Sequence, residues 1–514
     1  MAHLYRGGRI LSPNSRPLTA LIIEDGRLAW IGDDAEASGI TRAGMRITDL
    51  DGAIVTPGFV DAHVHATSTG LTLLDLDLAH TCSALEVLEA VESEASRHPG
   101  SVILGHGWDE SRWSDPSLPS AQEIDRASNG ARVYLTRVDA HSALVSTALI
   151  AAVPGVSEMN GFDSSGWVTQ EAHHALRESA LGSLSQATRA RAQHAFLAEA
   201  ARKGIVSVHE MAGPVISSEA DCRHLLSAAN ELGGTRVVAY WGEVAQLGGI
   251  ELAADIGARG TGGDIFVDGS LGSHTACLHE PYLDAPHTSG REFMDHDTLV
   301  VHVDLCVRAG QQTGFHAIGD AATEAVVAAY TRAAEIHGPE LVRGQRHRIE
   351  HAEAMSSTSI AECARLGIIA SMQPAFDRRW GGDGGMYASR LGRDRAASLN
   401  ALGELRDAGV SIAFGSDAPV TPLDPWGAIR AALEHRTPSQ RVDLVFAIDA
   451  HTRAGWHAAG VSESGRLAVG AMAHLAIWPS MPGGELPEAG AAAMRTIIDG
   501  KACWDSGQLE DLAC

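Results

Sequence analysis

Two histidines that are separated by one residue, His63 and His65, end an apolar run of this sequence, PGFVDAHVH (57–65). Residues i and i+2 of a β-strand point to the same side, so both imidazoles would face one point. An isolated pair of this kind more often caps a strand or lies on the polar surface. Here, however, three further residues of metal-binding type follow later apolar runs: His316, His351 and Asp417. Imidazole and carboxylate are ligands that a divalent ion such as Zn²⁺ prefers, so we expect a metal site.

The elements that must position these residues are eight apolar runs, which alternate with Ala- and Arg-rich helical patterns. Repeated βα units with nearly continuous apolar strands predict a parallel α/β barrel. We expect its strands at residues 57–65, 204–211, 236–242, 264–270, 314–320, 346–351, 368–374 and 411–417. Polar residues gather at the C-terminal ends of these runs: His65, Glu210, Asp268, Asp320, His351, Gln373 and Asp417. Because the chemistry of such barrels takes place at that face, we expect these residues at the barrel mouth.

Segments outside the eight runs predict two further parts of the molecule. Short β-like runs separated by Gly, Asn and Asp turns fill residues 4–56, and similar runs fill the last stretch of the chain. We expect residues 1–56 and 465–514 to form one small β-sandwich, and residues 57–464 to form the barrel. The stretch from about 75 to 195 carries strand-like pieces of its own, and we expect it to be an inserted lid subdomain over the barrel mouth. The predicted fold class is therefore α/β: a distorted (β/α)8 TIM barrel with a terminal β-sandwich and a lid.

Composition narrows the range of partners and compartments. The 514 residues include 39 Lys and Arg against 64 Asp and Glu, which gives a formal net charge of −25. This balance argues against nucleic-acid and anionic-membrane partners, since either requires a basic face. The N-terminal residues lack the apolar segment of a signal peptide, no run is long enough to span a bilayer, and the seven Cys include no C-x-x-C. We expect a cytoplasmic homodimer with a small-molecule substrate and no disulfide framework.

Six motifs occur in a fixed order along the chain: TPGFVDAHVH, FVDGSLGSHTA, FHAIGDAA, HRIEHAE, SMQPAF and GSDAPVTPLDP. In order and spacing they resemble the amidohydrolase superfamily, and within it the family 3 branch that includes the N-substituted formamide deformylases. The resemblance covers nearly the whole chain, and GWDESRW, LPSAQEID and VDAHS of the insertion also fit that branch. It implies that Asp417 both approaches the metal and takes a proton from the attacking water. It further implies four histidine ligands: His63, His65, His316 and His351.

One position departs from the family pattern. Many relatives open the fourth strand with a Lys, and in the wider superfamily a fourth-strand Lys can be carbamylated to bridge two metal ions. Here that position is Asp264, and the sequence holds only two lysines, Lys203 and Lys501, neither of which lies near the fourth strand. A carbamylated bridge is therefore excluded. An Asp side chain is much shorter than a carbamylated Lys and need not reach the same point, so we expect one tightly bound metal ion. The alternative is a second ion bridged by Asp264 or Glu210.

Other polar residues near the predicted mouth have two interpretations each. Glu210 is a metal ligand or, as we favour, a residue that positions a ligand. Three residues are candidates for substrate contact: His141, His274 and Gln373. His141 could equally pack within the lid. The pair His173–His174 lies in a helical pattern, and we expect it on the surface.

The function that these predictions favour is metal-dependent hydrolysis of a C–N bond of the amide, N-formyl or N-acyl type. A bound divalent ion lowers the pKa of water toward about 7, and a nearby carboxylate can accept the proton and pass it to the leaving amine. The same site could hydrolyse an ester or a lactone. A further alternative is a hydrolase-like scaffold that has lost catalysis and serves in binding, which the altered residue Asp264 keeps open.

Overall fold

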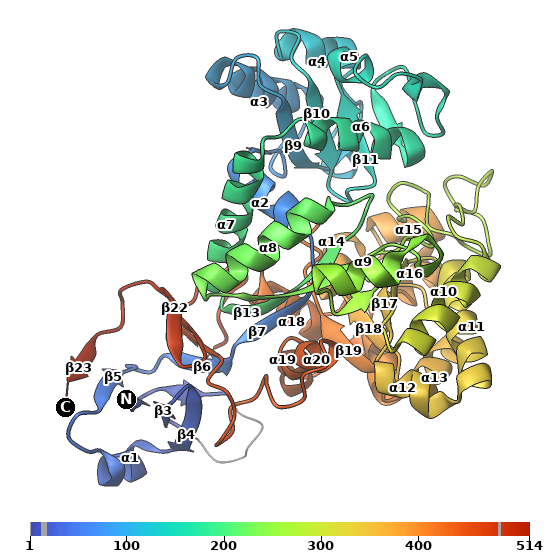
Figure 1. Ribbon diagram of the computed structural model, residues 1–514. Coiled ribbons are helices and arrows are strands. Elements are labelled where there is room, and N and C mark those ends of the chain that lie inside the picture. The colour runs from blue at the N-terminus through green and yellow to red at the C-terminus, as the bar shows by residue number, and fades with distance from the viewer. Residues whose placement is uncertain (1, 12–17, 482–484, 514) are drawn as a thin grey trace.

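The computed structural model describes residues 2–11, 18–481 and 485–513. Figure 1 shows three parts: a central α/β body, a β-rich part that contains both ends of the chain, and a third part that contains α3 to α6. Within the described residues, no helix combines the length and the apolar character that a bilayer span requires.

The central body contains two four-stranded sheets in which every pair of neighbouring strands is parallel. The first sheet has the order β15-β14-β13-β7 and consists of Gly260–Thr261, Arg236–Trp241, Ile205–Ala212 and Phe59–Val64. The second has the order β16-β17-β18-β19 and consists of Gly314–Ala317, Arg348–His351, Ile369–Met372 and Ser411–Phe414. Isolated parallel bridges link the two sheets at both edges: Val64 to Ala418, Gly260 to Gln312 and Phe266 to His316.

The fourth expected strand, DIFVDGS (264–270), is wrong in its position. The structure places the short strand β15 before it, at Gly260–Thr261, and pairs only Phe266 of the expected run. Between the two, Gly262 and Gly263 have φ angles of 152° and 88°, which residues with a side chain rarely adopt. A Cβ at Gly262 would collide with the backbone of Gly314, so the turn depends on glycine. This turn ends the strand early and directs Asp264 toward the neighbouring strand ends.

Helices surround these sheets and carry clear start and stop signals. Several begin with a Ser or Asp whose side chain accepts a backbone N–H of the first turn, for example α7 (Gln186–Arg202), α8 (Glu219–Leu232), α10 (His296–Ala309) and α13 (Ser357–Leu366). The last three of these end at a glycine with positive φ. Further helices on the body are α2 (Ala66–Leu74), α9 (Gly249–Ile256), α11 (Asp320–His337), α12 (Pro339–Gln345), α14 (Pro374–Trp380), α15 (Met386–Leu391), α16 (Arg393–Ala397), α17 (Leu402–Asp407), α18 (Pro425–Leu433), α19 (Leu444–Ala450) and α20 (Arg453–Ala458). The largest apolar core lies between the strands and these helices.

Strands from both ends of the chain share the two sheets of the β-rich part. One sheet has the order β23-β5-β1-β3-β4 and consists of Asp511–Ala513, Arg46–Asp49, His3–Arg6, Ala20–Glu24 and Arg27–Gly32. The other has the order β2-β6-β20-β21-β22 and consists of Arg9–Ile10, Ile54–Pro57, Leu475–Trp478, Arg495–Ile498 and Lys501–Asp505. The pairs β23–β5 and β20–β6 join the two ends antiparallel, which is why N and C lie close together in Figure 1.

The inserted segment, residues 75–195, contains a separate five-stranded mixed sheet. Its strands, in the order β12-β11-β10-β9-β8, are Trp167–Thr169, Ser142–Val145, Val133–Arg137, Ile103–Trp108 and Leu76–Asp77. The helices α3 (Ala84–Arg97), α4 (Ala121–Ala127), α5 (Thr147–Ile150) and α6 (Gln170–Gly182) accompany it. Two apolar clusters fill the segment, and every member of both clusters comes from the segment itself.

Candidate functional site

Three histidines from two strands present the same ring nitrogen to one place. His63 Nδ1 lies 2.9 Å from Glu350 Oε2, His65 Nδ1 lies 3.2 Å from the Met211 carbonyl oxygen, and His351 Nδ1 lies 2.9 Å from Gln373 Oε1. Each Nδ1 therefore donates its proton to an acceptor, and each Nε2 faces the centre. Metal-binding histidines in proteins are oriented in this way.

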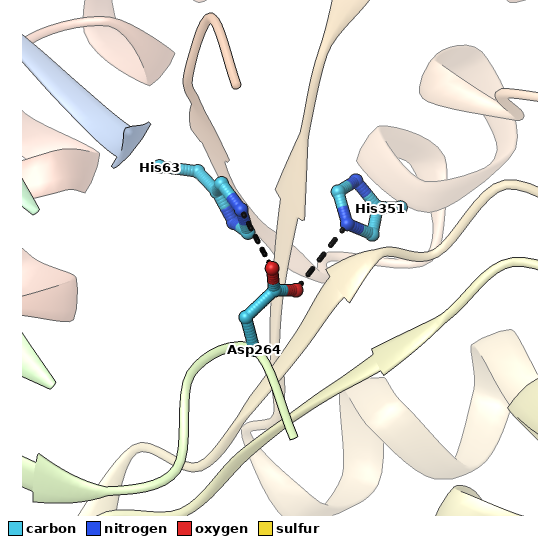
Figure 2. A group of neighbouring side chains, drawn as sticks. All are labelled: His63, Asp264 and His351. Carbon is cyan, nitrogen blue, oxygen red and sulfur yellow. Dashed lines mark ion pairs between the residues drawn. The ribbon is translucent and has the colours of Figure 1, made fainter. Parts of the chain in front are cut away.

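Two carboxylates face these Nε2 atoms. Asp417 Oδ1 lies 3.1 Å from His65 Nε2 and 3.5 Å from His63 Nε2. Asp264 lies between His63 and His351, with one oxygen toward each ring, as Figure 2 shows. The ligand atoms form two compact groups, His63 with His65 and Asp417, and His63 with Asp264 and His351. The turn at Gly262–Gly263 thus carries the short Asp264 side chain to the centre, where the sequence suggested that it need not reach.

The backbone at two of these residues is in an uncommon conformation. His351 and Asp417 have φ angles of 70° and 53°, in the left-handed region that residues with a Cβ rarely occupy. The Asp417 N–H donates to the His63 carbonyl oxygen at 2.8 Å, which ties the end of β19 to the end of β7. Such strain is common where a side chain must be held in one functional orientation.

Burial and the neighbouring charges have opposite effects on the pKa values of this centre. Burial alone would lower the pKa of His351, but Asp264 and Asp417 raise it to about 10. Burial would likewise raise the pKa of Asp264, yet the surrounding imidazoles hold it well below its ordinary value. His63 Nε2 and Asp264 Oδ1 are buried and have no hydrogen-bond partner among the described residues. Unpartnered nitrogen and oxygen donors that converge in this way fit a divalent cation.

His316, the remaining expected ligand, borders the centre but belongs to neither group. Its ring centroid lies 4.5 Å from that of His351, and its buried Nδ1 is 3.4 Å from Asp268 Oδ1 without a hydrogen bond. Asp268 accepts three backbone N–H groups, from Cys277, Ile318 and Gly319, and so fixes the loops around this histidine.

Beneath the centre lies a buried ion pair that the sequence analysis missed. Arg348 donates to both oxygens of Glu350, to the Ala62 carbonyl oxygen and to Ser371, and it also lies 2.8 Å from His209 Nδ1. Burial would raise the pKa of Glu350, but Arg348 and His63 lower it to about 2. The signal was the alternation R-x-E in a strand, which places both charges on the same face of β17.

The other candidate residues fall in different places. Glu210 Oε2 accepts the Ala66 N–H at 2.6 Å at the start of α2, so Glu210 positions the backbone after His65 and belongs to neither ligand group. Gln373 orients His351, as described above. His274 does not line the pocket described below, because its Nε2 lies 3.0 Å from Asp284 on the loop after β15. His141 does line it, and burial lowers its pKa to about 3.

A pocket lies above the ligand groups, and the inserted segment supplies much of its wall. Its polar lining includes His65, Asp264, His351 and Asp417 from the centre, together with Tyr134, His141, His174 and Arg177 from the inserted segment. The pair His173–His174 is therefore not on the surface as expected. His173 is buried and lies 2.8 Å from the Tyr134 hydroxyl, because helix α6 packs on β10 along this face.

Comparisons with known proteins agree with this architecture. The model of the amidohydrolase family matches residues 46–502. The chain is 28% identical to the protein LONG AFTER FAR-RED 3 of Arabidopsis thaliana, over 95% of this chain and 89% of that protein. It is 24% identical to the N-substituted formamide deformylase of Arthrobacter pascens, over 94% of each chain. Among solved structures, an uncharacterized metal-dependent hydrolase from Pyrococcus furiosus is similar with a TM-score of 0.70 and 26% identity, over 93% of this chain and 98% of that one. The chain belongs to the amidohydrolase family.

Proposed function

We propose that this protein is a metal-dependent hydrolase that cleaves a C–N bond of the amide, N-formyl or N-acyl type. The observation that carries the proposal is the convergence of three imidazole Nε2 atoms on two carboxylates at the base of a pocket. The similarity to an N-substituted formamide deformylase supports the bond type. We favour Zn²⁺, since imidazole nitrogen and carboxylate oxygen are its common ligands in hydrolases.

The residues that would hold the ion are His63, His65, His351, Asp264 and Asp417. When bound, a divalent ion supplies Lewis acidity and acidifies water at the site to a pKa of about 7. Burial would raise the pKa of Asp417, but His63, His65 and His351 lower it, so its carboxylate is ionised at neutral pH. Asp417 then accepts the proton of the attacking water and donates it to the departing amine nitrogen.

The same proposal gives the parts of the fold their roles. The two parallel sheets, linked by bridges at both edges, would act as one distorted (β/α)8 barrel. The inserted segment would be a lid that excludes water and contacts the substrate through residues such as His141. The paired terminal strands would form one composite β-sandwich. We further propose that the protein is a cytoplasmic homodimer. Light scattering on the purified protein tests its assembly state.

A metal-replete activity screen tests the function. The protein is stripped with a chelator, reloaded with Zn²⁺ and assayed on N-formyl amines, N-acyl amino acids, cyclic amides, esters and lactones. We expect amine release that depends on the metal. Turnover confined to esters or lactones would favour the alternative hydrolase, and a metal-loaded protein without turnover on any of these substrates would favour the binding scaffold.

A further inference from the structure

We propose that Asp264 bridges two metal positions, in the place where a carbamylated lysine serves in related enzymes. The inference rests on the proposed metal-dependent function and extends it to the number of ions and the bridging group. Its basis is that the two oxygens of one carboxylate face different ligands. Asp264 Oδ2 lies 3.5 Å from His65 Nε2 and 3.8 Å from His63 Nε2, whereas Oδ1 lies 3.6 Å from His351 Nε2 (Figure 2).

These distances match those between ligand atoms that share an ion. Two ligands bound at about 2.0–2.1 Å in a tetrahedral site are separated by about 3.4 Å. The separations at this centre, from 3.1 Å between Asp417 and His65 to 3.8 Å between Asp264 and His63, lie around that value. One position would therefore lie among His63, His65 and Asp417, with Asp264 Oδ2 next to the two imidazoles. The other would lie next to Asp264 Oδ1 and His351, on the side where the His316 ring is found.

A lysine carbamate is not a competing bridge in this chain. Lys203 donates to the Gly490 carbonyl oxygen at 2.6 Å, and Lys501 is exposed on β22 in the β-rich part. The Gly262–Gly263 turn directly precedes Asp264, and from this position the short Asp264 side chain reaches the imidazoles of the centre. It follows that the two-metal centre assembles without carbon dioxide.

Metal counting on purified protein tests this bridge. The apoprotein is loaded with Mn²⁺ in bicarbonate-depleted buffer, the bound ions are counted by elemental analysis, and the electron paramagnetic resonance spectrum shows whether they are coupled. We expect two coupled ions in the parent, and one uncoupled ion or none in Asp264→Asn. Glu210→Gln is the matched control, because Glu210 is also buried next to His65 but faces the Ala66 N–H; it should keep both ions.

Each result decides the question separately from the function. One ion in the parent, two coupled ions in Asp264→Asn, loss of coupling in Glu210→Gln alone, or a second ion that appears only with bicarbonate would overturn the bridge. Circular dichroism and thermal unfolding show whether a variant that has lost metal is folded. If Asp264→Asn is unfolded, Asp264→Glu replaces it as the test, because it keeps the carboxylate. The number of ions bound to Asp264→Glu must then equal two for the proposal to stand. Because no substrate is used, two coupled ions without hydrolysis would refute only the proposed function.

A different observation, an arginine in the pocket wall that has no carboxylate partner among the described residues, points to a substrate that carries a carboxylate. Arg137 and Arg177 both line the pocket. Arg137 is neutralised by three carboxylates, those of Asp109, Glu110 and Asp139. Arg177 has no carboxylate within ion-pair distance among the described residues, and its guanidinium donates only to Ser68 Oγ, at 3.3 Å.

Ser68 places this cation in the same pocket as the metal centre. It lies three residues after His65, the residue that precedes α2, and both residues line the pocket together with Arg177. A carboxylate held by Arg177 would thus share the pocket with a scissile C–N bond at the centre. N-acyl and N-formyl amino acids have this arrangement, and the guanidinium binds a carboxylate through paired hydrogen bonds.

A comparison of matched charged and uncharged substrates tests this assignment. N-acyl and N-formyl amino acids are compared with their uncharged carboxamides in the parent and in Arg177→Met, which keeps the length of the side chain. We expect KM for the carboxylates to rise 10–100-fold in the variant with kcat little changed, and KM for the carboxamides to stay constant. Equal KM values for both substrate types in the parent, or equal losses in the variant, would overturn it. If no substrate is turned over, displacement of bound N-acyl amino acid measured by calorimetry gives the same comparison.

Discussion

Replacing Glu350 by Gln tests whether the buried ion pair beneath the centre controls metal binding. Gln keeps the shape of the side chain and one acceptor oxygen, but it removes the negative charge that accepts the His63 Nδ1 proton at 2.9 Å. A partner of this kind is typically worth 10–100-fold in metal affinity, or about 1.4–2.8 kcal/mol. The change also leaves the fully buried Arg348 without the carboxylate that pairs with it, which typically destabilises a fold by about 3–5 kcal/mol.

A double variant separates these two effects. Glu350→Gln combined with Arg348→Met removes both charges, so the free energy of unfolding should partly recover while the metal affinity stays low. Competition with a chromophoric chelator measures the affinity for Zn²⁺, and urea unfolding of the apoprotein measures stability. A folded Glu350→Gln protein that binds Zn²⁺ within threefold of the parent would refute the reasoning, as would full recovery of affinity in the double variant.

Three further predictions follow from other parts of the structure. Asp417→Asn should lower kcat at least 100-fold, since general acid–base groups contribute about 10²–10⁴-fold; near-parental turnover with metal bound would remove Asp417 from the mechanism. Arg137→Met leaves three carboxylates clustered in the inserted segment, and it should destabilise the protein by about 3–5 kcal/mol; an unchanged melting temperature would contradict this. Burial lowers the pKa of His302 to about 4 and that of His347 to about 3, so the unfolded chain binds protons first as the pH falls below 6.5. The contribution of these two neutral rings to the free energy of unfolding is therefore fully present above that pH, and each ring should lose about 2 kcal/mol of it at pH 5. A urea midpoint that is equal at pH 7.5 and pH 5 would contradict this.

How much the sequence predicts differs from one residue to the next. The convergence of His63 and His65 follows from the two-residue period of a strand, and the order of the motifs identifies the family over nearly the whole chain. The position of Asp264 could not be predicted in the same way, because it depends on a turn that ends β15 three residues before the expected strand begins.

Buried polar residues are the part of the site that the sequence predicts least well. In one sequence, Arg348 and Glu350 look like ordinary charged residues, and only the packing of β17 against β7 and β13 shows that each is the partner of the other. In the sequence, His173 and His174 likewise look like residues on a solvent-exposed face of a helix, because nothing in it shows what packs against them. A tertiary contact, the one between α6 and β10, decides their environment, and helical periodicity does not reveal it.

The two closed apolar clusters of the inserted segment have a consequence for how this protein could change over evolutionary time. The proposed metal ligands all lie outside the segment, and the largest apolar core around their strands contains no residue of the segment, whereas Tyr134, His174 and Arg177 of the pocket wall lie inside it. Substitutions in the segment can therefore accumulate and reshape the wall while the reaction centre keeps its geometry. Exchanging the whole segment between relatives should therefore transfer substrate preference as a unit, without a change in the reaction centre.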